Sequence, residues 1–442
     1  MQISLSEHFT YSKLLRFTLP SIAMMIFTSI YGVVDGIFVS NMVGEEAFTA
    51  VNFIMPVVMI LSTTGFMFGT GGSALVAKLL GEKKDEKANQ VFSLIVYTAA
   101  AVGMVLAVIG IIFMKKVALA LGADEAMAEQ CAVYGRIVVA ALPFFALQMA
   151  FQSLFITAEK PKLGFAVTVA AGVGNMIFDA LFMGVFKWGV AGAAVATALS
   201  QAIGGIIPLI YFFRPNSSLL RLGKTVMDIR SLWKTCTNGS SELVSQASMS
   251  IVNMLYNSQL MKYIGKNGVS AYGVMMYVNL VFLAIFIGFS VGSAPIVSYH
   301  YGAENHEELK GLRQKSLVII GIASAIMLIL SQVLARPLAS IFVGYNEELL
   351  NLTTRGFRIF AVLFLFAGLN IFGSSFFTAL NNGPVSAAIS FLRTVVFQVG
   401  MLFLLPLIFD ADGIWASVTA AEMLSAIVTV GFLVGMRKKY KY

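Results

Sequence analysis

Apolar segments long enough to cross a lipid bilayer follow one another along nearly the whole chain, and they restrict its fold more than any other feature. A spanning helix needs about 20 mostly apolar residues. Because hydrocarbon offers no hydrogen-bond partner, a chain of this kind must bond its backbone internally and folds into helices. We read about twelve such segments, at residues 14–38, 47–78, 88–114, 127–157, 162–186, 188–213, 236–261, 268–300, 312–341, 350–380, 384–408 and 413–436.

The composition agrees with an integral membrane protein. Hydrophobic residues make up 58% of the chain and charged residues 12%, whereas a soluble domain is about 25% charged and about 45–50% apolar. Cys131 and Cys236 show no CxxC spacing, and the three histidines show no metal-ligand spacing, so we expect neither a structural zinc nor a disulfide framework. No cleavable signal peptide is expected, because the first apolar segment continues without a small-residue cleavage site.

The second half of the chain repeats the first. Shifted by 221 positions, half of the 442 residues, Gly302 falls on Gly81 and Phe372–Ala379 falls on Phe151–Ala158. A register kept over most of the chain indicates duplication. Six spans per half is an even number, so both repeats enter the membrane in the same direction and leave a cavity between them.

We therefore predict an all-α integral membrane protein with twelve transmembrane helices in two parallel six-helix lobes. The predicted N-lobe covers residues 1–213 and the C-lobe residues 234–442. The most polar interior stretch, residues 214–233, joins them as a linker.

The basic residues predict the orientation of the chain. The formal net charge is +8, and most Lys and Arg side chains fall in the connections on the side of the amino terminus. Short cytoplasmic connections carry an excess of Lys and Arg, so we expect both termini in the cytoplasm. The basic surplus is thus explained by topology, without a nucleic-acid partner.

A few carboxylates lie well inside the predicted spans. An ionisable side chain in hydrocarbon costs about 2.5–3.5 kcal/mol on insertion scales and is a functional candidate by default. The acidic residues are placed selectively, since none occurs inside spans eight to eleven. The candidates are Asp35, Asp179, Glu242 and Glu422.

The first-half carboxylates have other oxygen groups within reach. Asn175 precedes Asp179 by four residues, so both side chains share one helix face, and Thr197 follows in a span rich in small residues. With Asp35, these residues would supply two carboxylates, an amide and a hydroxyl. Such oxygens suit Na⁺, whereas two carboxylates at one site also favour a proton on one of them. Simple hydrogen bonding between helices remains the structural alternative.

Span seven carries a polar line at helical spacing. A lipid-facing position would be costly for these side chains, so the line should face protein or a water-filled cavity. Polarisable and aromatic side chains in spans seven and eight could add adaptable walls for flat apolar cations, although ordinary core packing explains them as well. The candidate cavity residues are Glu242, Gln246, Asn253, Tyr256, Asn257 and Met276.

The second half lacks an equivalent of the first-half cluster. The repeat partners of Asp35, Asn175, Asp179 and Thr197 are not acidic. Glu422 occupies the repeat position of Gln201, and Arg393 is available to it as an ion-pair partner, which would give Glu422 a structural role. The repeat partners of the cluster are Tyr256, Val396, Gly400 and Val418.

The residues that carry a family resemblance are Asp35, Asn175–Asp179, Gly192–Thr197 and the paired stretches Gly72–Gly81 and Gly292–Gly302. Together with the duplicated twelve-span chain, they resemble the multidrug and toxic compound extrusion (MATE) family, and within it the DinF-like bacterial branch. The resemblance implies two lobes in a V shape, a bacterial cytoplasmic membrane and a monomer. It also implies export of cationic amphipathic compounds coupled to inward flow of H⁺ or Na⁺.

The resemblance further implies that Asp35, Asn175 and Asp179 hold the coupling ion, with Thr197 alongside. The acidic residue that some relatives carry in span ten is missing here, so we expect no ion site in the C-lobe. No cofactor besides the coupling cation is expected, and no enzymatic activity, because the glycine-rich Gly69–Ala74 lies inside an apolar span and lacks the other parts of a nucleotide site.

The main alternative is a lipid-linked oligosaccharide flippase with a similar two-lobed architecture. A flippase should line its cavity with several cations for the pyrophosphate, and only Arg393, with Arg136 and Arg358 near the outer side, is available. A channel is a third class, disfavoured because a lobed duplication with a buried ion site suits alternating access.

Overall fold

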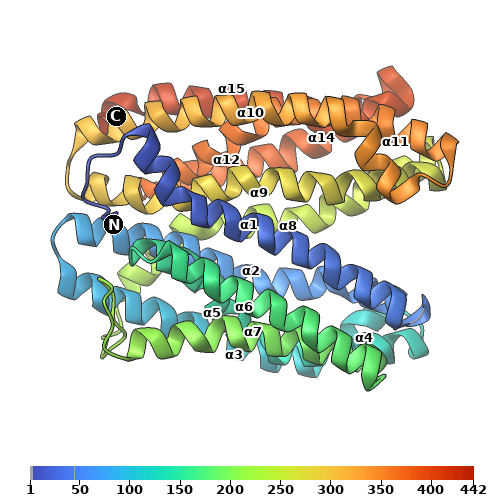
Figure 1. Cartoon of the computed structure of the whole chain (residues 1–442), viewed down its shortest axis with the longest axis horizontal. Coiled ribbons are helices and arrows are strands. Elements are labelled where there is room, and N and C mark those ends of the chain that lie inside the picture. Colours follow the sequence, from blue (N-terminus) through green and yellow to red (C-terminus); the bar gives the residue numbers. More distant parts are fainter. Residues whose placement is uncertain (1–2, 44) are drawn as a thin grey trace.

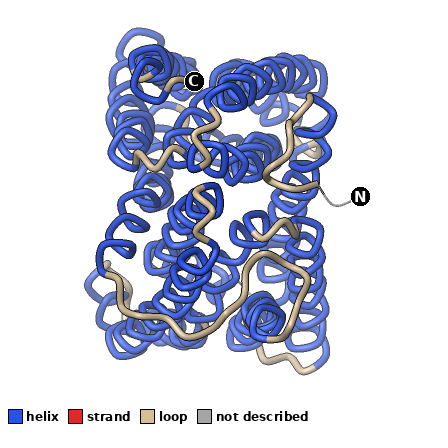
Figure 2. The backbone as a smooth tube through the Cα atoms, turned by 90° about the vertical axis from the view of Figure 1, so that its left-hand side faces the viewer, coloured by secondary structure: helices blue, strands red, loops and turns tan. Residues whose placement is uncertain are grey.

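The computed structural model describes residues 3–43 and 45–442, and within these ranges it contains helices and no strand (Figure 2). Ten helices are long and apolar enough to cross a membrane, and a pair bent by 51° at Ala141 supplies an eleventh. The remaining span, Ile229–Tyr263, is 35 residues long and more polar than the others, with Glu242, Gln246 and Asn253 along it. With it, the predicted twelve spans are all present.

The N-lobe lies on one side of the molecule, below the C-lobe in Figure 1. Its fourth span is broken, because Pro143 stands at the start of α5 and cannot continue the hydrogen bonding of α4. The N-lobe elements are α1 (Tyr11–Met42), α2 (Glu45–Gly81), α3 (Asp85–Ala120), α4 (Glu125–Ala140), α5 (Leu142–Thr157), α6 (Pro161–Asp179), the π-helix η1 (Ala180–Val185) and α7 (Gly189–Phe213).

The C-lobe repeats this order, and both chain termini lie at the same end of the molecule (Figure 1). An extended stretch between Phe213 and Ile229 joins the lobes, so the last five residues of the predicted linker, 229–233, already belong to α8. The C-lobe elements are α8 (Ile229–Tyr263), α9 (Lys266–Gly302), α10 (His306–Val343), α11 (Glu347–Phe360), η2 (Ala361–Leu363), α12 (Phe364–Ala379), α13 (Gly383–Phe391), the π-helix η3 (Leu392–Phe397), α14 (Gln398–Leu404), α15 (Pro406–Gly435) and α16 (Arg437–Tyr440).

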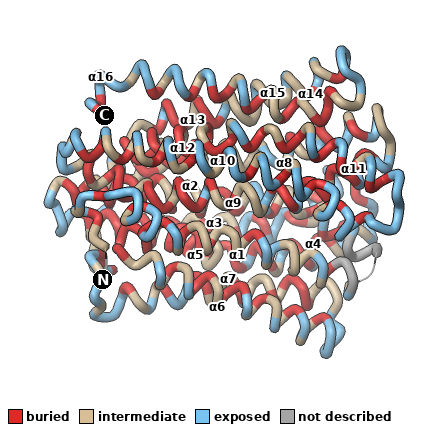
Figure 3. Tube along the Cα trace, turned by 45° about the horizontal axis from the view of Figure 1, so that its top comes forward, coloured by how far each residue is buried: buried red, intermediate tan, exposed pale blue. Residues whose placement is uncertain are grey.

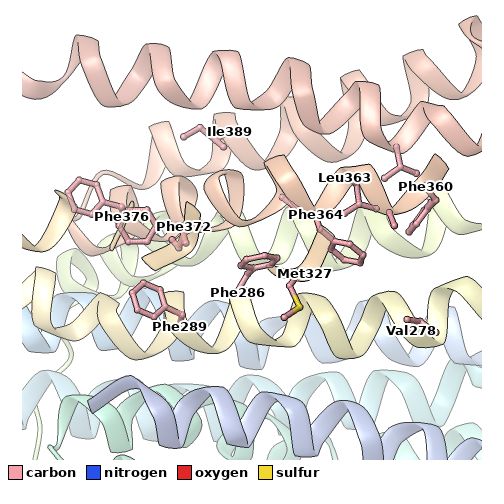
Figure 4. Packing of buried hydrophobic residues seen from close by; sticks show 14 of the residues in the cluster. Val278, Phe286, Phe289, Met327, Phe360, Leu363, Phe364, Phe372, Phe376 and Ile389 are labelled. Atoms are coloured by element: carbon pink, nitrogen blue, oxygen red, sulfur yellow. The ribbon is translucent and has the colours of Figure 1, made fainter. Parts of the chain in front are cut away.

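Two apolar clusters lie within the N-lobe, and a third fills the C-lobe and extends across the interface to Phe17 of α1 and Ile156 of α5. In the C-lobe, Phe286 and Phe289 of α9 lie across from Phe364 and Phe372 of α12 (Figure 4), and the Phe289 and Phe372 rings are 6.4 Å apart. Buried residues gather toward the middle of the molecule and exposed ones toward its outside (Figure 3). Many of the exposed residues are large and apolar, as expected for surfaces that contact lipid.

The lobes contact each other through α1 against α9 and α2 against α8. Gly81 and Gly302 are repeat partners, and a Cβ added to either would collide with backbone of the other's helix, at Tyr299 and Lys78 respectively. Only glycine permits so close an approach of two backbones. These contacts lie near the end of the molecule that holds the termini, so the lobes are closed tightly there.

The opposite half of the interface is less crowded at its glycines. Gly32 and Gly36 of α1 and Gly273 of α9 have no described atom within 4 Å of the position that a Cβ would take. The tight glycine contacts therefore close one end of the inter-lobe interface and do not extend along all of it.

Candidate functional site

The last turn of α6 presents the central pair of the candidate site. Asn175 and Asp179 are spaced by four residues on one face, and their exposed fractions are 3% and 0%. The helix changes to the π-helix η1 directly after Asp179. A π-helical turn inside a helix often marks a functional site, and here it follows the buried carboxylate.

Asp35 reaches this pair from α1. Its carboxylate lies close enough to interact with both Asp179 and Asn175. Gly172 brings the helices together, since a Cβ there would press on the rings of Phe27 and Tyr31. The structure thus brings together Asp35, Asn175 and Asp179, three residues separated by up to 144 positions in the sequence.

The inner oxygens of these groups have no partner among the described residues. Asp35 Oδ1, Asn175 Oδ1 and both carboxylate oxygens of Asp179 are buried and accept no hydrogen bond there. Burying a charge without a partner costs several kcal/mol per ion. Such an arrangement is suited to receive a cation or a proton, because either would cancel the repulsion between two neighbouring carboxylates.

Thr197 lies level with Asn175 on the neighbouring helix. Ser200 of α7 donates its hydroxyl to the Ala171 carbonyl of α6 at 3.0 Å. Because the two helices run antiparallel, one turn outward from this contact leads to Asn175 on α6 and to Thr197 on α7. The Thr197 hydroxyl donates to its own helix at Ala193 O, 3.1 Å away, which leaves its oxygen free to accept.

Tyr134 of α4 is a part of this site that the sequence did not indicate. Its side chain is 3% exposed and lies close enough to interact electrostatically with both Asp35 and Asp179. The hydroxyl donates to the Met55 sulfur at 3.7 Å, a weak acceptor. A buried phenol beside two carboxylates could also donate to one of them after a small rotation.

Three glutamines form a second polar group, which the sequence did not indicate as a site. Gln148 and Gln152 are buried on one face of α5, and Gln201 lies on α7, where Gly204 allows the Gln148 side chain to approach closely. Each of the three has one buried polar atom without a partner among the described residues. Uncharged polar side chains inside apolar spans are a usable signal for such a group, as they are for Asn175 and Gln246.

The polar line on α8 has a mixed environment. Glu242 and Gln246 are half-buried and Asn257 is exposed. Glu242 makes no hydrogen bond or ion pair within the described part of the chain, although Arg393 is close enough to act on it electrostatically. Asn253 accepts a hydrogen bond from Tyr272 at 3.1 Å, so its carbonyl already has a partner. Met276 of α9 is half-buried.

Tyr256 lies inside the C-lobe and does not line a cavity. Its side chain is 1% exposed, its hydroxyl bonds the Ser417 hydroxyl at 2.6 Å, and its ring stacks on Tyr272 at 5.2 Å. Helical periodicity placed it beside Glu242, but it turns toward α15. The prediction of Tyr256 as a cavity residue is therefore replaced by a packing role.

Glu422 is held by a complete set of partners. Arg393 donates to Oε1 from Nε at 2.8 Å and lies 2.7 Å away through a second nitrogen, while Asn370 donates to Oε2 at 2.7 Å. Thr429 in turn donates to Asn370 Oδ1 at 3.0 Å. The side chains of Arg393 and Glu422 are 19% and 8% exposed. Glu422 is thus neutralised within the protein, unlike Asp35 and Asp179 of the N-lobe.

A protein-family model described as MatE matches residues 20–181 and 243–404, one stretch in each lobe. Among curated proteins, the chain is similar to the multidrug export protein MepA of Staphylococcus haemolyticus (strain JCSC1435). The identity is 23% over 435 residues, which cover 98% of this chain and 95% of that protein. It is also similar to the MepA of Staphylococcus aureus (strain MRSA252), at 22% over 425 residues, covering 95% and 92%.

Solved structures share the fold. A crystal structure of MATE in complex with MaL6 superimposes with a TM-score of 0.92 at 21% identity, over 98% of this chain and 97% of that one. The outward-facing conformation of a multidrug resistance MATE family transporter of the MOP superfamily gives 0.91 at 21% identity, over 98% and 97%. At these identities the likeness concerns the backbone fold, while the site must be interpreted from this chain's own residues.

Proposed function

The chain belongs to the MatE family, and from this membership we propose that it exports cationic amphipathic compounds across a membrane in exchange for H⁺ or Na⁺. It is a multi-pass membrane transporter and not an enzyme. The multidrug export proteins to which it is similar along nearly its whole length support drug-like cations as the substrates. The single observation that carries the proposed ion coupling is that Asp35 Oδ1 and both carboxylate oxygens of Asp179 are buried together without a partner among the described residues.

Asp35, Asn175, Asp179 and Thr197 hold the coupling ion in this proposal. An incoming H⁺ or Na⁺ cancels charge between Asp35 and Asp179, and oxygen groups of this kind are suitable ligands for a hard cation. Pro20, Gly32 and Gly36 give α1 the means to bend as this interaction changes. Ion and drug must stabilise opposite conformations, because a coupled exchange requires a differential affinity of each for the two states.

The drug occupies the space between the lobes next to the polar face of α8. Glu242, Gln246 and Asn257 offer polar contacts there, with Met276 as an adaptable apolar wall. Glu242 is the strongest candidate for a cationic group, because no described residue forms an ion pair with it. Asn253 contributes its amide nitrogen, since its carbonyl is bonded to Tyr272.

The protein lies in a bacterial cytoplasmic membrane with both termini inside. The Staphylococcus relatives support the bacterial setting, and the basic connections on the side of the termini support the orientation. In this orientation the tightly closed end of the lobe interface faces the cytoplasm. We further propose that the N-lobe (1–213), the linker (214–233) and the C-lobe (234–442) work together as a monomer.

The alternative of a lipid-linked oligosaccharide flippase receives less support from the structure. A pyrophosphate group needs unpaired cations, and Arg393 is bonded to Glu422. Glu242, on the polar face of α8, is a carboxylate without an ion-pair partner among the described residues, and it would repel a pyrophosphate.

Ethidium efflux from proteoliposomes tests the proposal. A proton gradient and a sodium gradient are imposed separately on wild type and Asp35→Asn. We expect one gradient to drive efflux in the wild type and neither in the variant, which should still insert and purify normally. Gradient-driven efflux that persists in Asp35→Asn would exclude this carboxylate from coupling.

A further inference from the structure

The short segment that precedes α1 contacts both lobes. At its beginning it is bonded to Glu159, which lies in the connection between α5 and α6 of the N-lobe. The Ser4 hydroxyl donates to Glu159 Oε1 at 2.8 Å, and the Leu5 backbone N–H donates to the same oxygen at 2.7 Å. One N-lobe carboxylate thus binds two successive residues of the segment.

The other end of the segment is bonded to the C-lobe. Glu308, in the first turn of α10, accepts the Phe9 backbone N–H at 2.9 Å through Oε1. Its Oε2 lies 2.6 Å from His8 Nδ1. The Lys315 ammonium, also on α10, donates to the Phe9 carbonyl. A carboxylate from each lobe therefore holds one end of the residue 4–9 segment.

The segment is packed into the molecule. Leu5 and Phe9 are both 0% exposed, and the Phe9 ring makes edge-on contacts with Phe17 at 6.0 Å and His300 at 6.4 Å. Within the segment, Glu7 accepts from the Ser4 backbone N–H at 3.0 Å and from Lys13 at 2.6 Å. These bonds, with Lys13 the larger contributor, hold the pKa of Glu7 below its ordinary value and fix the turn.

In the C-lobe, the connection that follows α12 makes different bonds from the connection that follows α5 in the N-lobe. Asn381 follows α12 as Glu159 follows α5, and both have left-handed backbone, with φ of 56° and 59°. Asn381 accepts from Asn238 at 2.8 Å and donates to the Ala74 carbonyl of α2 at 3.3 Å. The C-lobe connection thus reaches the other lobe directly and without charge, whereas the N-lobe connection does so through the residue 4–9 segment.

We propose that residues 4–9 form a strap that holds the lobes together at the end of the molecule where the termini lie, and that this end opens only when the strap leaves Glu159 or Glu308. The bonds to Glu159 and the bonds to Glu308 can exist together only while residues 4–9 can span the distance between the two carboxylates. They therefore stabilise the closed arrangement selectively, which is the requirement for shifting a conformational equilibrium. The inference deepens the proposed export function, because alternating access requires this end to open.

Cys236 provides a native reporter for the test. It is half-buried on α8 and packs against the apolar interior of the N-lobe, so separation of the lobes at this end would expose it. Cys131 is buried within the N-lobe and can be removed as Cys131→Ala. The measurement is the rate at which a membrane-impermeant maleimide labels Cys236 in the purified full-length protein in lipid nanodiscs, which leave both faces accessible.

Glu159→Gln and Glu308→Gln should each raise the labelling rate about tenfold, the effect expected when charge-assisted hydrogen bonds are lost from one of two states. A strap released at either end is released altogether, so the double variant should label no faster than the faster single variant. His8→Ala, which leaves both carboxylates in place, should give a smaller increase in the same direction.

Glu125→Gln is the matched control. It removes an exposed carboxylate that pairs with Lys115 at 2.7 Å far from the strap, and it should leave the labelling rate unchanged. The proposal would be overturned if both single variants elute as monodisperse protein and label at the wild-type rate. It would also be overturned if the increase in the double variant equals the product of the two single increases. The labelling measurement needs neither drug nor ion gradient. If the export proposal fails, efflux is therefore absent while the strap variants still label faster than wild type.

Discussion

The two lobes share a helical scaffold and differ in how they treat their buried carboxylates. In the N-lobe, Asp35 and Asp179 lie together with inner oxygens that no described residue binds. In the C-lobe, Glu422 is bonded by Arg393 and Asn370. The scaffold was duplicated, but among the described residues two unpartnered carboxylates lie together only in the N-lobe, while Glu242 of the C-lobe stands alone on α8. Under the proposed ion coupling, this difference would place the coupling chemistry in one lobe of a pseudo-symmetric molecule.

The largest effect is expected from neutralising the N-lobe pair. Asp179→Asn should lower gradient-driven efflux about 100-fold or more, since loss of coupling between two sites removes a factor of up to about 150. The measurement is ethidium efflux from proteoliposomes at matched protein density. Efflux within twofold of wild type would contradict the claim that coupling depends on the N-lobe carboxylates.

The next largest effect is expected on the free energy of unfolding, when the C-lobe residue Glu422 is replaced. Glu422→Leu leaves the Arg393 guanidinium without its carboxylate partner in a largely buried place, which should cost about 2–3 kcal/mol. Thermal unfolding in detergent should report a lower midpoint, while the folded fraction keeps its efflux. Arg393→Met combined with Glu422→Leu should recover part of the loss, because no charge is left unpaired. A stable Glu422→Leu protein that no longer transports would instead assign coupling to the C-lobe.

Each lobe contributes one of two equivalent glycines, Gly81 and Gly302, to the tightly closed end of the lobe interface. Gly81→Ala and Gly302→Ala each direct a methyl group at backbone of the facing helix, and overpacking of this kind costs about 1–3 kcal/mol. Both should accelerate maleimide labelling of Cys236 to a similar extent, because the two positions are repeat partners. Gly32→Ala, which meets open space, serves as the control. Strongly unequal effects would contradict a symmetric closure.

The smallest effects distinguish two buried tyrosines. Tyr134→Phe removes a hydroxyl beside Asp35 and Asp179 and should lower efflux up to about tenfold, corresponding to one hydrogen bond. Tyr256→Phe removes the bond to Ser417 and should lower stability by about 1 kcal/mol with efflux preserved. Thermal midpoints and efflux rates measured on both proteins would show the reverse pattern if Tyr256, and not Tyr134, faced the transported ion.

Much of the fold could be predicted because runs of apolar residues indicate the spanning helices. The spans, the duplication and the two lobes follow from such runs and from the 221-residue register. The α8 span is predictable from the sequence although its polar line, beginning at Glu242, makes it less apolar than a typical span. Breaks such as the π-helix after Asp179 could not be foreseen, since they depend on packing between helices.

The candidate site was predictable where charge signalled it. Asp35 and Asp179 are costly in hydrocarbon, and Asn175 shares a face with Asp179, so these three could be grouped from the sequence. Tyr134 could not, because a tyrosine in a span is ordinary and its position beside the carboxylates arises from the packing of α4. Tyr256 was misplaced because periodicity defines the faces of a helix without saying what each face meets.

The most direct test of the central claim is the ion flux that accompanies drug release, measured in Asp179→Asn and Glu422→Gln side by side. Substrate is added to proteoliposomes at equilibrium, and the resulting movement of H⁺ or Na⁺ is recorded with an indicator trapped inside. The account predicts a substrate-driven flux in Glu422→Gln and none in Asp179→Asn. A flux that survives in Asp179→Asn and vanishes in Glu422→Gln would contradict it.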